Sequence, residues 1–225
     1  MRRHKQAATM APMNETTATP TTSVKHELHR KLHISRAAVL SKLDGLSEYD
    51  LRRPMTPTGT NLLGLVKHLA SMEYGYLGET FDRPPPETLP WVADGSIWDG
   101  ADMWATATES SEYVIGLYRR ACAHGDRTID ELDLDAPGSV AHWPAEGRAT
   151  TLGVILIRML AETAQHAGHA DIVRELIDGS AGADHDEFGG EQEWNRYIER
   201  IRHAADHFNP DRADPFETKD EHTGR

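Results

Sequence analysis

The sequence predicts an all-α protein: a bundle of four long helices followed by an additional C-terminal helix. Two observations support this. Apolar residues recur at alternating intervals of three and four in four long segments, which is the spacing of one helix face. The strict alternation that marks a half-buried β-strand is nearly absent. Helices with one apolar face bury it against one another, and a four-helix bundle is the simplest arrangement that does so.

The expected helices cover residues 24–46, 60–81, 105–131 and 150–178. The first carries one apolar stripe, formed by Leu28, Leu32, Val39, Leu43 and Leu46. A threonine, Thr60, is expected to cap the second, and Gly179 is expected to end the fourth, because glycine is the usual residue just after a helix C-terminus. The additional C-terminal helix is amphipathic, with its apolar face formed by Trp194, Tyr197, Ile201, Ala204 and Phe208.

The remaining segments suggest one helical domain between two tails. Residues 1–22 are rich in threonine, alanine and proline, and residues 210–225 are polar, so both are expected to be disordered. The bundle is expected to occupy residues 23–209, and the sequence leaves open whether Met1 or Met13 is the true start. Two long loops carry tryptophans that either anchor the loops to the bundle or rim a pocket: Trp91, Trp98, Trp104 and Trp143.

Bulk properties exclude several classes of partner. The 225-residue chain has a formal net charge of −12, which argues against nucleic acid or an anionic membrane surface as the main partner. No apolar run approaches the roughly 18 residues of a transmembrane helix, and the N-terminus lacks the apolar core of a secretory signal. The single Cys122 rules out an internal disulfide framework. We therefore expect a cytoplasmic protein.

A candidate metal site lies in the fourth helix, in the stretch MLAETAQHAGHADIV. Glu162, His166 and His169 continue the apolar stripe that begins at Leu152, where a bundle helix would normally carry leucines. A buried charge is costly unless it is paired or bound to a metal. His68, near the middle of the second helix, is the candidate third ligand. Two histidines and one carboxylate are a common ligand set for Zn²⁺ and Fe²⁺.

Spacing alone does not decide between a metal site and an internal polar network. The chain has 13 histidines, so chance pairs at helical spacing are certain. His26, His29 and His33 lie beside the apolar stripe of the first helix and indicate a solvated face. The same interpretation applies to His203 and His207 in the last helix.

The sequence also resembles the DinB superfamily of four-helix-bundle metal enzymes, and within it the actinobacterial mini-circle-type branch related to mycothiol-dependent enzymes. The likeness rests on KLDGLSEYDLRRPMTPTGTNLLGLVKHLASMEYGYLGE, on ADMWATATES and on AETAQHAGHADIVRELIDG, and it spans roughly residues 24–208. The family pattern has a histidine in the second helix and His-x-x-x-His-x-Gly-Gln in the fourth. This chain has Glu162 in place of the first of those histidines and His169 in place of the glutamine. Mycothiol-dependent maleylpyruvate isomerases also place a glutamate ligand at the first position.

The resemblance implies a DinB-like bundle in which His68, Glu162 and His166 hold a divalent metal, with zinc favoured over iron or nickel. It further implies a transferase or isomerase that activates a low-molecular-weight thiol, mycothiol being the expected one, for reaction with a small-molecule substrate. His169 is the expected catalytic residue as a proton carrier, and its place in the family pattern leaves open that it supports a ligand or faces the substrate. A homodimer is compatible with the residues. A non-catalytic, stress-type metal-binding protein and a metal-dependent hydrolase are the alternatives.

Overall fold

The computed structural model describes residues 23–180 and 189–209. The two expected tails therefore lie outside the described residues. The long helices are α1 (Val24–Ser41), α3 (Leu62–Leu77), α5 (Ser111–Glu131), α6 (Leu152–Asp178) and α8 (Glu191–Asp206). The shorter elements are α2 (Glu48–Arg52), α4 (Pro90–Ala93), the 3₁₀ helices η1 (Glu79–Phe81), η2 (Ser96–Asp99) and η3 (Ala145–Gly147), and the strands β1 (Pro137–Ser139) and β2 (Ala149–Thr151).

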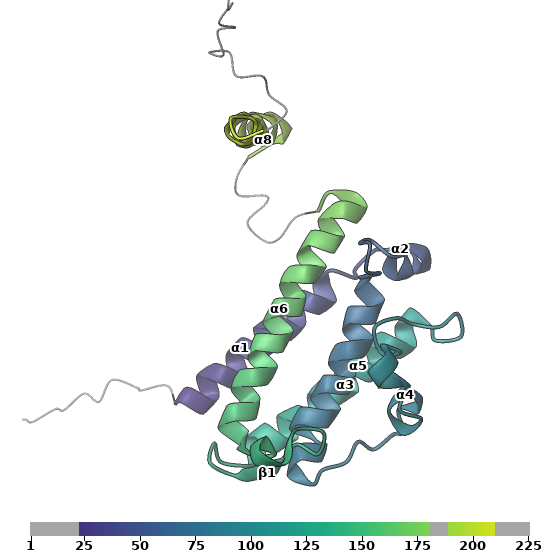
Figure 1. The fold of residues 1–225 in the computed structure, drawn as a ribbon, viewed down its shortest axis with the longest axis vertical. Helices are drawn as coiled ribbons and strands as arrows, with labels where there is room; N and C mark the ends of the chain where they lie inside the picture. The colour runs from purple at the N-terminus through teal and green to yellow at the C-terminus, as the bar shows by residue number, and fades with distance from the viewer. Residues whose placement is uncertain (1–22, 181–188, 210–225) are drawn as a thin grey trace, which may run out of the picture.

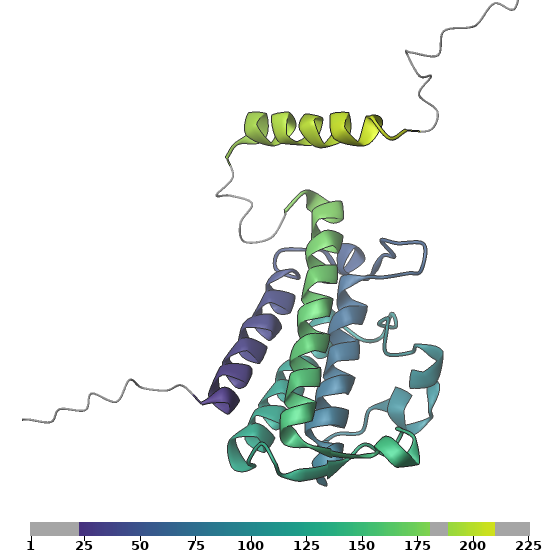
Figure 2. The same ribbon diagram turned by 60° about the vertical axis from the view of Figure 1, so that its left-hand side comes forward.

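Helices α1, α3, α5 and α6 form the bundle, with α3 packed against both α5 and α6, and α1 packed against α6 (Figures 1 and 2). The all-α prediction and the four expected bundle helices are confirmed. In the described ranges the only sheet is the antiparallel β1–β2 pair. Each strand is three residues long, too short to give an alternation signal in the sequence.

Side-chain caps explain where three bundle helices begin. The side chains of Ser23, Asn61 and Ser110 each accept a hydrogen bond from a backbone N–H in the first turn of α1, α3 and α5. The cap of α3 is thus Asn61, one residue after the predicted Thr60. Helix α6 ends as expected at Gly179, whose φ of 80° is the left-handed conformation that favours glycine.

The bundle core contains one charged cluster that the apolar stripes do not reveal. Arg36 lies on the stripe of α1 between Leu32 and Val39 and is buried. Its guanidinium donates to both carboxylate oxygens of the buried Glu73 of α3, at 2.7 and 2.6 Å, and to Oδ1 of Asp126 of α5 at 2.6 Å. Three bundle helices therefore meet at one bidentate ion pair.

The last helix forms as predicted, but it adds nothing to the bundle core. None of the residues of α8 is buried, and the helix lies apart from the four bundle helices (Figure 2). Tyr197 and Ile201, from its apolar face, are 38% and 52% exposed. No helix among the described residues has the length and apolar character needed to cross a membrane.

Candidate metal centre

The middles of α3 and α6 bring His68, Glu162 and His166 together. Oε1 of Glu162 lies 3.3 Å from Nε2 of His68 and 3.2 Å from Nε2 of His166. One ligand atom from each residue lies within 4.8 Å of the other two. The structure thus gathers the three predicted ligands at one depth of the bundle, with both imidazole nitrogens facing the same carboxylate oxygen.

The position of these residues on α6 differs from the prediction in one respect. They lie on the flank of the core stripe and do not interrupt it. After Met159 the buried face continues through the small residues Thr163, Ala167 and Ala170, whereas Glu162 and His166 are half-buried and His169 is exposed.

The physical reason is the pitch of the helix. A stripe drawn at alternating threes and fours advances 3.5 residues per turn and drifts around a straight helix of 3.6 residues per turn by roughly 20° per heptad. The last residue of the drawn stripe, Leu176, is 58% exposed, although Val173 before it is still buried.

The sequence analysis missed the residue that orients His68. Oδ2 of Asp102, in the loop before α5, lies 2.7 Å from Nδ1 of His68, and this aspartate is only 3% exposed. A carboxylate that accepts from Nδ1–H directs Nε2, the other ring nitrogen, toward Glu162. Metal-binding histidines usually have such a partner, which fixes the ring orientation and raises its basicity.

The loop that carries Asp102 is held firmly against α3. Nζ of Lys67 donates to the backbone oxygens of Ala101 and Trp104, at 2.9 and 3.0 Å. Gly64 allows the close approach, because a Cβ at this position would lie 1.9 Å from the backbone oxygen of Met103. The ADMW segment is therefore packed directly on the helix that carries His68.

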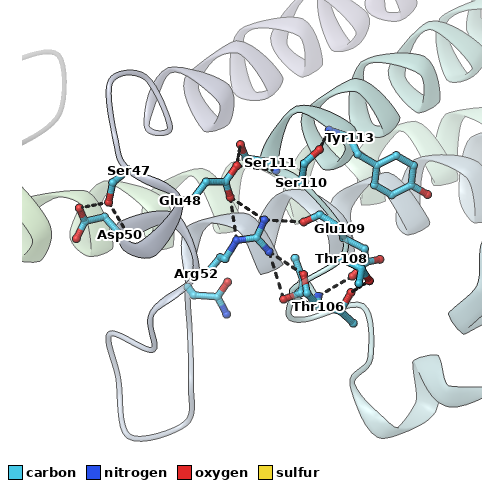
Figure 3. Close-up of polar contacts among 12 residues, drawn as sticks. Ser47, Glu48, Asp50, Arg52, Thr106, Thr108, Glu109, Ser110, Ser111 and Tyr113 are labelled. Carbon is cyan, nitrogen blue, oxygen red and sulfur yellow. Dashed lines mark hydrogen bonds and ion pairs between the residues drawn. The ribbon is translucent and has the colours of Figure 1, made fainter.

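A second set of contacts fixes the C-terminal end of the same loop (Figure 3). The guanidinium of Arg52, from α2, donates to the backbone oxygens of Thr106 and Glu109 and to the carboxylate of Glu48. Glu48 in turn accepts from the side chain of Ser111, at the start of α5. These contacts tie α2 to the start of α5 and leave residues 101–110 in the loop, so α5 begins at Ser111 and not at residue 105.

The electrostatics of the three residues are those of a carboxylate between two imidazoles. Burial lowers the pKa of His68, but its hydrogen bonds to Asp102 and Glu162 outweigh burial and raise that pKa above its ordinary value. Burial raises the pKa of Glu162, and the two histidines outweigh burial and lower it. The pKa of His166 is lowered by burial and by the neighbouring His68. Glu162 is therefore ionised and His166 neutral, as metal ligands must be.

His169 lies on the outer side of this cluster. Its Nδ1 lies 3.3 Å from Nδ1 of His166, and its side chain is exposed. It does not line the pocket described next. This geometry places His169 behind His166, on the side away from Glu162.

A pocket of about 960 Å³, here called the central pocket, opens onto the site. His68, Asp102 and Glu162 form part of its wall, and α3, α6, the 84–103 segment and the loop at His142 enclose it. The volume is at the upper end of the usual range for small-molecule sites, roughly 300–1,000 Å³. Of the loop tryptophans, Trp98 lines the pocket, whereas Trp91 is buried and donates to the hydroxyl of Ser71, so one lies at the rim and the other anchors its loop.

A second group of similar composition lies between α1 and α5. His29, His33 and Asp126 also place ligand atoms within 4.8 Å of one another. Nε2 of His29 and of His33 lie 2.8 and 3.7 Å from Oδ1 of Asp126. The prediction of a solvated face fits the exposed His26 and His33, but His29 is half-buried against Asp126. We call these three residues the α1–α5 cluster.

A family model described as mycothiol-S-transferase matches residues 27–179. This chain belongs to the mycothiol-S-transferase family. The match confirms the expected DinB-like superfamily and includes the whole bundle, with His68, Asp102, Glu162 and His166, while α8 lies outside it. The family indicates a mycothiol-related transferase that acts on a small molecule.

Among solved structures, this mycothiol-S-transferase family member is similar to a conserved protein from Enterococcus faecalis. The TM-score is 0.54 at 13% sequence identity, and the match covers 71% of this chain and all of the other. At that identity the similarity supports the fold alone. No protein of curated function matches the chain.

Proposed function

We propose that this protein transfers a low-molecular-weight thiol, mycothiol, to an electrophilic carbon of a small molecule at a divalent metal held by His68, Glu162 and His166. The observation that carries the proposal is that these three residues are gathered together in a chain of this family, and that two of them, His68 and Glu162, line a 960 Å³ pocket. Zinc is the metal that we favour, because nitrogen and carboxylate ligands in a three-residue set suit it.

The donor set fits such a metal. Its members are one carboxylate of lowered pKa, one imidazole of lowered pKa and one imidazole oriented by Asp102. A metal bound there supplies positive charge that lowers the pKa of a coordinated thiol, so that the thiol is ionised near neutral pH. Because His68 and Glu162 line the pocket, a small molecule in the pocket would lie beside two of the residues that would hold the metal.

The side chains of this protein would perform the remaining work. Asp102 holds His68 in one tautomer, with Nε2 free to bind the metal. His169 would perform the same task for His166 by accepting a hydrogen bond from its Nδ1–H. We therefore propose a positioning role for His169 in place of the proton transfer expected from the sequence.

The net reaction forms one bond and breaks one. The thiol sulfur forms a bond to the electrophilic carbon, the leaving group departs with the electron pair of its former bond, and the thiol proton goes to solvent.

The test is a transfer assay with untagged, zinc-reconstituted protein, mycothiol and an alkyl halide. Wild-type protein is expected to accelerate formation of the thioether, and Glu162→Gln and His166→Ala are expected to abolish that acceleration. The matched control is His33→Ala, which removes a histidine of the α1–α5 cluster and should leave the rate unchanged. Hydrolysis of an ester without any thiol would instead support the metal-dependent hydrolase. Metal binding without either reaction would support the non-catalytic binder.

A further inference from the structure

The central pocket contains a cation that the proposed reaction does not use. Arg158 lies on α6 four residues before Glu162, one helical turn or roughly 6 Å along the axis. It lines the pocket together with His68 and Glu162. Its guanidinium carbon lies 4.8 Å from the ring centroid of Tyr76 and 5.2 Å from that of Trp143.

The charges around Arg158 leave it without a counter-ion. Arg158 is exposed, no ion pair within the described residues includes it, and it is the only lysine or arginine that lines the pocket. Three of the acidic residues in the wall have partners of their own, Asp102 with His68, Glu162 with both histidines, and Glu87 with Arg120. Glu79, the fourth, is exposed.

The neighbouring imidazole does not offset this charge. The pKa of His142 is lowered by burial and by the nearby Arg158, so its ring is neutral around pH 7. The ring lies 5.8 Å from that of Tyr76 and 5.6 Å from that of Trp98. Arg158 is therefore a single positive charge within an aromatic corner of the pocket.

These ring contacts leave the hydrogen-bond donors of Arg158 available. Aromatic rings attract the face of a guanidinium through their quadrupole and fix its plane. They do not occupy the N–H groups around its edge. Those groups form a planar fork that matches a carboxylate and binds it in a bidentate manner.

We propose that Arg158 binds a carboxylate on the acceptor substrate, the molecule whose electrophilic carbon receives the thiol. This inference rests on the proposed function and deepens it, because it names the acceptors as carboxylate-bearing electrophiles. The carboxylate would then be bound by a residue that lies one helical turn from Glu162 on α6.

Two electrophiles that differ in one group test this. Iodoacetate and iodoacetamide both lose iodide when a thiol attacks their methylene carbon, but only iodoacetate carries a carboxylate. The rate of transfer from mycothiol is measured with zinc-reconstituted protein and corrected for the uncatalysed reaction, and mass spectrometry confirms that Cys122 is unmodified. For Arg158→Gln we expect kcat/KM with iodoacetate to fall at least about tenfold, as for loss of a charge-assisted hydrogen-bond pair, while iodoacetamide is unaffected.

Two further variants test whether the effect requires the guanidinium at position 158 and not merely the loss of any arginine. Arg158→Lys keeps the charge but not the fork and should restore only part of the preference. Arg119→Gln removes an exposed arginine of α5 and should change neither rate. An equal effect of Arg158→Gln on both electrophiles would overturn the proposal, because it would indicate a purely structural role.

Binding provides a readout that needs no turnover. Benzoate and benzamide are titrated into the metal-free protein, and the indole N–H resonances of Trp98 and Trp143 are followed by NMR. Benzoate should bind more tightly than benzamide to wild type and equally weakly to Arg158→Gln. Failure of the proposed function would appear as the absence of transfer to either electrophile by wild type. Failure of this inference would appear as equal responses to the charged and neutral members of each pair.

Discussion

The bundle holds two groups of two histidines and one carboxylate, and they differ in what surrounds them. At the candidate metal centre the polar partners of Glu162 among the described residues are two imidazoles, and Nδ1 of His68 is paired with an acid, Asp102. In the α1–α5 cluster Oδ1 of Asp126 already accepts from Arg36 at 2.6 Å and from His29 at 2.8 Å. A fixed guanidinium beside the ligand oxygen occupies it and repels a divalent cation.

The comparison teaches that ligand composition does not define a metal site. In both groups the ligand atoms lie within 4.8 Å of one another, and the groups differ in the charges of their neighbours, in the exposure of His33 and in access to the central pocket. Asp102 orients His68 as a possible ligand. Asp126 instead completes the ion-pair network around Arg36 that joins α1, α3 and α5. This difference supports the proposed metal site at His68, Glu162 and His166 and a structural role for the α1–α5 cluster.

The largest effect should come from breaking the network that distinguishes the α1–α5 cluster. Arg36→Leu leaves Glu73, which is fully buried, without its counter-charge, and should lower the free energy of unfolding by about 3–5 kcal/mol. Urea denaturation measures this. The matched control is Arg30→Leu, which removes an exposed ion pair with Glu27 and should cost less than about 1 kcal/mol. Equal costs for the two variants would refute a structural role for Arg36.

Removing both charges should turn the α1–α5 cluster into a metal site. The double variant Arg36→Met with Glu73→Leu replaces the ion pair by apolar side chains, which is often neutral for stability. Asp126 is then free to act as a ligand with His29 and His33. Zinc titration should show one more zinc per chain than in wild type. An unchanged zinc content would mean that Arg36 is not what prevents binding.

Two aspartates, each hydrogen-bonded to a histidine, provide a matched pair for metal affinity. Asp102→Asn removes the carboxylate that orients His68 and should weaken zinc binding about 10–100-fold. Asp126→Asn makes the equivalent change beside His29 and should leave zinc affinity unchanged. Competition with a chromophoric chelator measures both. Equal losses in the two variants would contradict the assignment.

The same Asp126 should contribute a pH-dependent part of the stability. Burial raises its pKa, but Arg36 and His29 outweigh burial and hold the pKa below its ordinary value of 3.8. Its contribution is therefore fully present above the unfolded-state pKa and is lost as the pH falls through the lower folded-state pKa. Asp126→Asn should cost about 1–2 kcal/mol at pH 7 and progressively less below about pH 4. A cost that is independent of pH would exclude an ionised Asp126 as the cause.

The parts of the site that the sequence reveals are those carried on helices. Helical spacing made His68, Glu162 and His166 candidates, because it aligned Glu162 and His166 with an apolar stripe and placed all three near the middle of two helices. The family resemblance pointed to the same three residues. The same logic could have identified Arg36, a charge between Leu32 and Val39 on the stripe of α1. Its partner Asp126 lies on another helix, and its pairing is a tertiary contact that spacing does not encode.

The residues of the site that could not be predicted from the sequence lie on loops or depend on contacts with loops. Asp102 lies 34 residues from His68, and it reaches that histidine only because Lys67, Gly64 and Arg52 dock its loop on α2 and α3. No periodicity marks a residue of this kind. The ADMW stretch, with an acid among apolar residues, was the one local signal. The stacking of Arg158 on Tyr76 and Trp143 likewise joins α3, α6 and a loop, which only the folded chain brings together.

The most direct measurement is elemental analysis of untagged protein after reconstitution with zinc, for wild type beside Glu162→Gln, His166→Ala and His33→Ala. The account predicts one zinc per chain in wild type and in His33→Ala, and none in Glu162→Gln or His166→Ala. Loss of zinc in His33→Ala with retention in His166→Ala would place the metal in the α1–α5 cluster and contradict the account. A wild-type protein without stoichiometric metal would reduce His68, Glu162 and His166 to a polar network beside a pocket.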